Sequence, residues 1–220
     1  ADIADLFSAP QSEMDRYVRR DGVTDWILST ARKQYGSRVT QEDIFYYVYG
    51  ILPAPDYRTT FAADLKKSLP RLPLVESPDD FWAFSRAGRS LAELHLGYER
   101  VEPYAGCHTV NSTTSEDDAS NYRVEKMRFG KLDSKTADKR IIHYNAGITI
   151  ENIPLEAYDY VVNGKSAIEW VMERYAVKTD PASRIENNPN DWCREHDDPK
   201  YIYNLLLRII TVSLETMKIV

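Results

Sequence analysis

The chain has 220 residues, with 28 lysines and arginines against 34 aspartates and glutamates, and 43% of its residues are hydrophobic. This composition is typical of a globular protein with one large or two small cores, and the net charge of −6 argues against indiscriminate binding of polyanions. No apolar run reaches the roughly 18 residues of a membrane span, and the N-terminus lacks the pattern of a signal peptide, so we expect a cytoplasmic protein without membrane contact.

Two further features of the sequence concern its setting. Cys107 and Cys193 are too few for a disulfide framework, which agrees with a reducing cytoplasm. The sequence starts at Ala1 rather than at methionine, which suggests a piece excised from a longer polypeptide.

The first part of the chain, residues 1–105, is predicted to be a helical lobe. Capping residues mark helix starts at Thr24 or Asp25, at Thr40 and at Ser77, and Pro55 opens a further helix. Apolar residues at spacing four predict that this further helix runs to about residue 69; they are Tyr57, Phe61, Leu65 and Leu69. Residues 106–120 are polar and aperiodic, and we expect an exposed loop there.

The hydrophobic period changes in the second part, residues 121–220. We read "YRVEKMRF" as a strand with a β-bulge at Glu125 and Lys126, "GKLDSKTAD" as a flexible connection, and "KRIIHYN" and "GITIENI" as two more strands. Ser166 opens a helix with a capping box, and Asp198-Pro199 starts a long final helix. The predicted fold class is α+β: an N-terminal helical lobe, then a small antiparallel sheet packed with helices and closed by a long C-terminal helix.

Signatures of catalysis are absent from the sequence. It contains no G-x-G-x-x-G, Walker A, G-x-S-x-G or H-E-x-x-H pattern. Cys107-His108 and the Cys193/His196 pair offer atoms that suit zinc, but adjacent cysteine and histidine are poor joint ligands. Asp79 and Asp133 make only a weak metal-dependent nuclease pattern, because they are far apart in sequence. We therefore predict no catalytic residue and no metal or cofactor site in this chain, and we keep a nuclease as a distant rival.

A local excess of positive charge stands out instead. Residues 121–145 hold seven lysines and arginines against three acidic residues, although the chain as a whole is acidic. Such an island can steer a polyanion to one face of a protein. The simpler interpretation is a solvated hairpin with surface lysines.

Several blocks of the sequence, in this order, resemble one known family. They are "VTDWILSTARKQYG", "EDIFYYVYGILPAPDYRTTFAADLKKSLPRLPL", "FSRAGRSLAELHLGYERVEPY", "YRVEKMRF", "GKSAIEWVMERYAVKTDPASRIENNPNDW" and "YIYNLLLRIITVSLETMKIV". Together they are similar to the C-terminal target-recognition (specificity) domain of type ISP restriction–modification enzymes, whose sequences often carry a DEAD/DEAH-box helicase label. The resemblance covers the chain from about residue 23 to its end.

The resemblance implies a large single polypeptide of bacterial defence. Its other modules would be a nuclease, an ATPase motor, a helical coupler and an adenine-N6 methyltransferase, which use S-adenosylmethionine, ATP and magnesium. The implied role of this domain is sequence-specific recognition of duplex DNA beside the methyltransferase domain of the same polypeptide. No base contact and no catalytic residue can be carried over.

The basic island supplies the candidate DNA-binding residues. They are Arg123, Lys126, Arg128, Lys131, Lys135, Lys139 and Arg140 for phosphate contacts, with one or two of the arginines able to pair with guanine, and Asn145 for base reading. Equally open as base readers are Lys178, Arg184 and Asn187. A candidate for a second backbone-contacting patch is the group Arg58, Lys66, Lys67 and Arg71. The alternative function is a scaffold that docks on the methyltransferase or motor domain without binding DNA itself.

Overall fold

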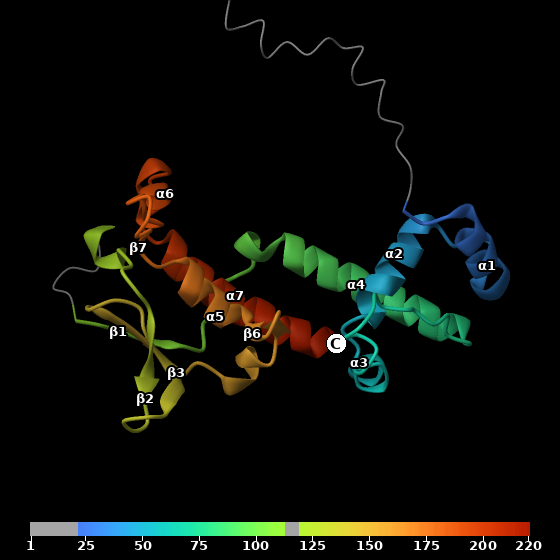
Figure 1. Ribbon diagram of the computed structural model, residues 1–220, viewed down its shortest axis with the longest axis horizontal. Coiled ribbons are helices and arrows are strands. Elements are labelled where there is room, and N and C mark those ends of the chain that lie inside the picture. The colour runs from blue at the N-terminus through green and yellow to red at the C-terminus, as the bar shows by residue number, and fades with distance from the viewer. Residues whose placement is uncertain (1–21, 113–118) are drawn as a thin grey trace, which may run out of the picture. The chain divides into compact units, whose positions relative to one another are not determined.

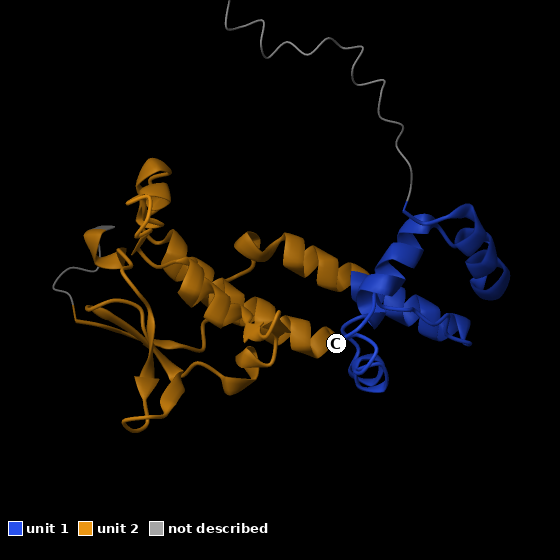
Figure 2. Ribbon diagram, viewed as in Figure 1, with its two compact units in different colours: residues 1–88 blue, residues 89–220 orange. Residues whose placement is uncertain are grey.

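The computed structural model describes residues 22–112 and 119–220 and divides the chain into two compact units, Ala1–Gly88 and Arg89–Val220 (Figure 2). The helices in the described residues are α1 (Asp25–Tyr35), α2 (Gln41–Ile51), α3 (Pro55–Thr60), α4 (Pro78–Leu96), α5 (Ala167–Arg174), α6 (Asn190–Glu195) and α7 (Tyr201–Ile219). The strands are β1 (His108–Asn111), β2 (Arg128–Lys131), β3 (Ala137–His143), β4 (Ile148–Glu151), β5 (Val161–Val162), β6 (Lys165–Ser166), β7 (Lys178–Thr179) and β8 (Glu186–Asn187) (Figure 1). This arrangement confirms the predicted α+β class with its long C-terminal helix. Among the described helices, each is too short or too polar to cross a lipid bilayer.

The helices of unit 1 begin where the local sequence predicts. The Thr24 hydroxyl accepts a hydrogen bond from the Ile27 amide at 3.4 Å. Thr40 and Asp43 form a reciprocal capping box, with the Asp43 amide donating to the Thr40 hydroxyl at 3.1 Å and the Thr40 amide donating to the Asp43 carboxylate at 3.0 Å. These bonds satisfy amides that have no partner inside the helix.

A proline-rich segment, residues 70–76, runs through unit 1 without regular structure and is held by side chains of the helices. Three tyrosine hydroxyls donate to its carbonyl oxygens: Tyr35 to Val75 at 2.6 Å, Tyr47 to Pro73 at 2.6 Å and Tyr57 to Arg71 at 3.0 Å. The Phe81 ring lies parallel to the Tyr35 ring, with 4.2 Å between centroids. Aromatic side chains of this unit therefore act both as core and as hydrogen-bond donors to the segment.

The helix predicted to run from Pro55 to about residue 69 is shorter than expected. It ends at Thr60, and hydrogen-bonded turns follow, with the Leu65 amide donating to the Phe61 carbonyl at 3.0 Å. Leu69, predicted to lie on the buried stripe, is 88% exposed. The paired β-branched residues Thr59 and Thr60 disfavour continuation of the helix.

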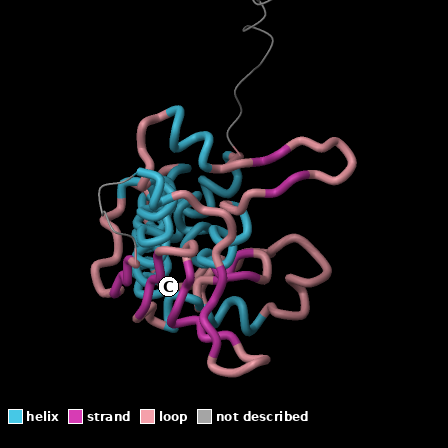
Figure 3. Tube along the Cα trace, turned by 90° about the vertical axis from the view of Figure 1, so that its left-hand side faces the viewer, coloured by secondary structure: helices cyan, strands magenta, loops and turns pink. Residues whose placement is uncertain are grey.

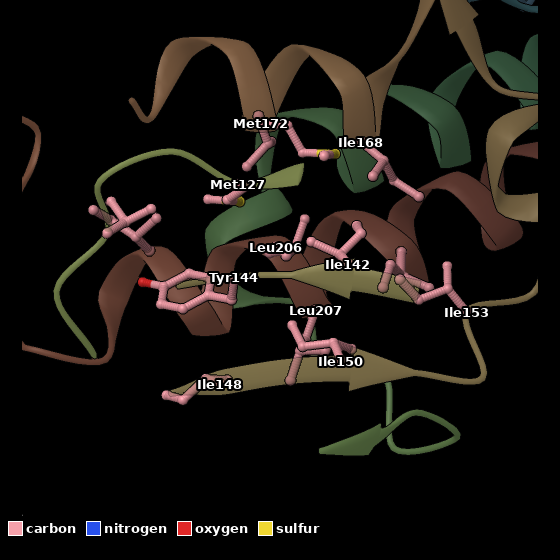
Figure 4. Close-up of a cluster of buried hydrophobic side chains, with 14 of the residues drawn as sticks. Met127, Ile142, Tyr144, Ile148, Ile150, Ile153, Ile168, Met172, Leu206 and Leu207 are labelled. Carbon is pink, nitrogen blue, oxygen red and sulfur yellow. The ribbon is translucent and has the colours of Figure 1, made fainter. Parts of the chain in front are cut away.

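Unit 2 is built on a four-stranded antiparallel sheet in the order β1-β4-β3-β2. Its register places Thr109, Ile150, Ile142 and Phe129 in one row across the four strands. This row faces the helices, because the Thr109 hydroxyl lies 2.7 Å from the Tyr203 hydroxyl of α7. Ile142 and Ile150 are fully buried and lie close to Leu206 and Leu207 of α7 in the core shown in Figure 4.

Three expectations for unit 2 are corrected. Strand β2 starts only at Arg128, and its register irregularity lies between Phe129 and Gly130, not at Glu125 and Lys126. The connection expected to be flexible is an ordered turn, in which the Asp133 carboxylate accepts the amides of residues 135 and 136 at 2.7 and 2.8 Å. Residues 108–111 of the expected loop 106–120 form β1, which pairs with β4; residues 113–118 of that loop lie outside the described residues.

Candidate nucleic-acid interface

The outward face of the sheet carries polar and charged side chains. The register places Val110, Thr149, His143 and Arg128 in one row, alternating with the buried row. His143 and Arg128 are exposed, and the His143 Nδ1 atom lies 3.1 Å from the Thr149 hydroxyl. Figure 3 looks at the molecule from the side that is on the left of Figure 1, where these strands lie. His143 therefore makes a cross-strand contact on an open surface.

Residues 121–127, which precede β2, are fixed by side chains and loops from the C-terminal part of the unit. Asn190 of α6 pairs with the backbone of Val124: its amide nitrogen donates to the Val124 carbonyl and its oxygen accepts the Val124 amide, both at 2.8 Å. The Glu125 carbonyl accepts the Val177 amide at 2.9 Å. These bonds use the backbone groups that a longer β2 would need, which explains why the predicted strand does not start earlier.

Three of the seven cations in the island are paired with carboxylates. Arg123 donates to Glu125 at 2.9 Å, and Arg140 makes a bidentate contact with Asp138 at 2.9 Å for both bonds. Lys139 donates to Glu169 of α5 at 3.1 Å. Hydrogen bonds from the Arg140 side chain and backbone hold the pKa of Asp138 below its usual value. These three cations therefore have less charge to offer an incoming phosphate.

Lys139 also packs against two aromatic rings. Its ammonium group lies 5.0 Å from the centre of the Tyr158 ring and 5.7 Å from that of Phe129. Burial raises the pKa of Glu169, but hydrogen bonds from Ser166 and Lys139 outweigh burial and leave the pKa lowered. The ion pair between Lys139 and Glu169 therefore joins β3 to α5.

The remaining four cations are exposed and form what we call the basic edge: Lys126, Arg128, Lys131 and Lys135. They lie on or beside β2, which is an edge strand of the sheet. Within the described ranges, none of them has a carboxylate oxygen within 4.0 Å. The basic edge therefore keeps its full charge toward solvent.

The side-chain amide of Asn145 is hydrogen-bonded to backbone groups of the same chain. Its nitrogen donates to the carbonyl oxygens of Asn121 and Arg123 at 2.7 and 2.9 Å. Its oxygen accepts the amides of Gly147 and Ile148 at 2.9 and 2.8 Å. The residue joins the β3–β4 turn to the segment before β2.

The other sequence candidates fall into two groups. Lys178, Arg184 and Asn187 belong to the β7–β8 hairpin of unit 2 and are all exposed. The proposed second patch lies in unit 1, where its members are also exposed: Arg58 on α3, Lys66 and Lys67 in the turns after it, and Arg71 in the proline-rich segment. The first group adjoins the basic edge, because Lys126 and Lys178 line one shallow depression of about 280 Å³.

Groups suited to metal binding or nucleophilic chemistry lie apart from one another within residues 22–112 and 119–220. In the described part of the chain, no three histidine, cysteine or acidic side chains come together in a way that could hold a metal ion. Burial raises the pKa of the Cys107 thiol to about 11, and burial also raises that of Cys193. The ring of His95 is stacked on Tyr160 with 5.3 Å between centroids, and its Nε2 atom lies 2.9 Å from the Thr216 hydroxyl.

Comparison with known proteins gives one family and several solved structures. A model of the Type ISP C-terminal specificity domain matches residues 3–205. A comparison with curated proteins gave no match.

Three solved structures that resemble the chain contain DNA. A nuclease-deletion mutant of the Type ISP restriction-modification enzyme LlaGI, in complex with a DNA substrate mimic, is 44% identical with a TM-score of 0.69; the match covers 82% of this chain and 13% of that one. The ATP-dependent Type ISP restriction-modification enzyme LlaBIII bound to DNA is 40% identical with a TM-score of 0.73, over 87% of this chain and 11% of that one. A DrdV-DNA complex is 27% identical with a TM-score of 0.73, over 93% of this chain and 20% of that one. The chain thus spans a fifth or less of each of these relatives.

Proposed function

The chain belongs to the Type ISP C-terminal specificity domain family, and on this premise we propose that it recognises duplex DNA through the basic edge of its sheet. The observation that carries the proposal is the group of four exposed cations without a carboxylate partner among the described residues, on or beside the edge strand β2 of an otherwise acidic chain. Lysine and arginine side chains of this kind bind phosphate oxygens and release the counterions condensed on DNA.

Different roles follow for the other residues of the island. Three cations, Arg123 before β2 and Lys139 and Arg140 on β3, form ion pairs that stabilise these parts of the chain. They contribute less to phosphate binding. Asn145 orders the segment before β2 and leaves base reading to other residues. Phosphate contacts of the basic edge fix the position of the protein on the duplex, and sequence is read elsewhere.

The proposal extends to the full-length protein. Because the solved relatives LlaGI and LlaBIII are restriction-modification enzymes of which this chain spans a small share, we assign catalysis to other parts of the polypeptide. An adenine-N6 methyltransferase using S-adenosylmethionine and an ATP-dependent nuclease using magnesium would supply it. The methyltransferase domain of the same polypeptide would be the partner of this domain on DNA.

Fluorescence anisotropy with a labelled random-sequence duplex tests the proposal. We expect the chain to bind at low ionic strength and to weaken log-linearly as salt rises. The double variant Lys126→Ala/Arg128→Ala should lower the affinity and reduce the steepness of the salt dependence by about 1.8, at about 0.9 for each phosphate contact.

A charge-matched control separates the site from the net charge. Lys33→Ala/Arg86→Ala also removes two positive charges, from exposed positions on α1 and α4, and should leave the salt dependence unchanged. Equal losses for the two double variants would contradict the assignment to the basic edge. Absence of binding at every ionic strength would favour the scaffold function.

A further inference from the structure

The β7–β8 hairpin is a short two-stranded ribbon beside the basic edge. Lys178 pairs with Asn187 and Thr179 with Glu186, and all residues from 178 to 187 are exposed. Figure 1 shows β7 next to α6. The ribbon is a solvent-facing element with no core of its own.

Both ends of the ribbon are anchored on the same stretch of backbone. Val177, immediately before β7, donates its amide to the Glu125 carbonyl at 2.9 Å. Asn190, shortly after β8, makes its pair of 2.8 Å bonds with Val124. The ribbon is therefore hydrogen-bonded at both ends to Val124 and Glu125, which immediately precede the basic edge.

The tip of the ribbon is ordered by one carboxylate. Asp180 Oδ1 accepts the backbone amides of Ala182 and Ser183 at 3.1 and 2.7 Å. Across the loop, the Asp180 amide donates to the Ile185 carbonyl and the Arg184 amide donates to the Asp180 carbonyl, both at 2.9 Å. An ordered tip loses less conformational entropy on binding than a flexible loop.

The side chains at the tip have the chemistry of base recognition. Arg184 adopts a left-handed backbone conformation with φ of 61°, and within the described residues its side chain has no partner. Ile185 beside it is 69% exposed, which is unusual for a large apolar residue in an ordered loop. Arginine pairs with the O6 and N7 atoms of guanine, and an apolar side chain can pack on the methyl group of thymine.

The charge of the ribbon favours base reading over phosphate binding. Lys178 and Arg184 are balanced by Asp180 and Glu186, so the ribbon adds no net attraction to the DNA backbone. The major groove, about 12 Å wide, admits a two-stranded ribbon. The neighbouring basic edge already supplies the charge that holds a duplex in place.

We propose that the β7–β8 hairpin enters the major groove as the base-reading element of this domain, with Arg184 as a specificity-determining residue. This inference rests on the proposed function. The basic edge positions the duplex, and the ordered tip carries Arg184 and Ile185 to the base edges.

Selection from a pool of duplexes with a randomised centre tests the inference on the 220-residue chain. Bound duplexes are recovered and sequenced for the unaltered chain, for Arg184→Ala and for Arg184→Lys. We expect the unaltered chain to enrich a motif that contains guanine. In both variants, the enrichment of guanine at one position of that motif should fall about tenfold. Lysine keeps the charge but not the planar fork of donors, so Arg184→Lys separates geometry from charge.

Binding to the unselected pool provides the second readout. Arg184→Ala should bind the unselected pool within about twofold of the unaltered chain and with nearly the same salt dependence, whereas Lys126→Ala should weaken binding to all sequences alike. Arg86→Ala, on α4 in unit 1, is the control and should enrich the unaltered motif.

The outcomes distinguish this inference from the proposed function. If Arg184→Ala and Arg184→Lys enrich the same motif as strongly as the unaltered chain, the hairpin does not read bases although the domain binds DNA. If the unaltered chain binds no duplex at low salt, the proposed function fails and the inference fails with it.

Discussion

The side-chain amide of Asn145 makes four hydrogen bonds to the backbone, at 2.7, 2.9, 2.9 and 2.8 Å. Asn187, in the exposed β7–β8 hairpin, is the same residue type in the opposite situation. The sequence offered both as candidate base readers. Occupied donors and acceptors distinguish them, because the Asn145 amide, if it turned to DNA, would leave four backbone groups without their present partner.

Replacement of Asn145 should therefore act on stability first. We expect Asn145→Ala to lower the free energy of unfolding by about 2 kcal/mol, and Asn187→Ala to change it by less than about 0.5 kcal/mol. Urea-induced unfolding followed by tryptophan fluorescence measures both. If Asn145→Ala kept its full stability yet lost affinity for DNA, the residue would be a DNA contact after all.

At the scale of elements, the β2–β3 hairpin is shaped by an irregularity in β3. Phe129 pairs with Ile142 while the next residue, Gly130, pairs with Asp138, so residues 139–141 have no counterpart on β2. A Cβ atom at Gly130 would lie 2.8 Å from the Cβ atom of Ile141, which explains the glycine at this position. Lys139 lies in this unpaired stretch and donates to Glu169 on α5, so its charge holds the sheet to the helix and is less available for phosphate binding.

The ion pair between Lys139 and Glu169 predicts a pH dependence of stability. The pKa of Glu169 is lowered in the folded chain, so its contribution is present above the unfolded-state pKa of about 4.3 and is lost as the pH falls through the folded-state value. We expect Glu169→Gln to be less stable by about 1 kcal/mol at neutral pH, and the difference to vanish in acid. Thermal unfolding followed by circular dichroism across this pH range measures the difference.

A second glutamate controls for the loss of charge. Glu195 is exposed on α6, and Glu195→Gln should leave the midpoint temperature of thermal unfolding unchanged at neutral pH. A stability gap for Glu169→Gln that stayed constant down to low pH would mean that the carboxylate charge contributes nothing.

At the scale of the whole molecule, two hydrophobic cores lie in the two units. One contains Tyr35, Tyr47 and Phe81, and the other contains the sheet residues together with side chains of α5 and α7. The two clusters share no residue in the described part of the chain. Helix α4 belongs to both units, since their boundary falls between Gly88 and Arg89.

Separate cores predict separate responses to core mutations. Phe81 is fully buried, and Phe81→Ala should cost unit 1 about 3–5 kcal/mol. Hydrogen exchange followed by mass spectrometry should show faster exchange in α1 and α2 and unchanged exchange in β3 and β4. Ile150→Ala is the reciprocal variant, with the opposite pattern expected. Faster exchange throughout the chain for either variant would mean that the two units unfold as one.

Local rules predicted some features of this fold and missed others. The caps at Thr40 and Ser166 were predicted correctly, and Thr24 is the one of the two predicted alternatives, Thr24 and Asp25, that caps α1; each cap is made between residues three positions apart. The start of β2 was predicted wrongly, because the bonds that displace it come from Asn190 and Val177, more than fifty residues away. The end of α3 at Thr60 was also missed, since four apolar residues at helical spacing outweighed the weaker signal of two threonines.

The amino-acid sequence alone determined the α+β class, the family and the position of the basic island, because periodicity, capping and ordered sequence blocks are properties of the chain itself. The tertiary structure decided which cations of the island stay available. Charge pairing depends on which carboxylate lies within reach, and Glu169, which takes Lys139, is thirty residues distant in sequence. It also placed the β7–β8 hairpin beside the basic edge, because the anchoring bonds to Val124 and Glu125 exist only once the chain has folded.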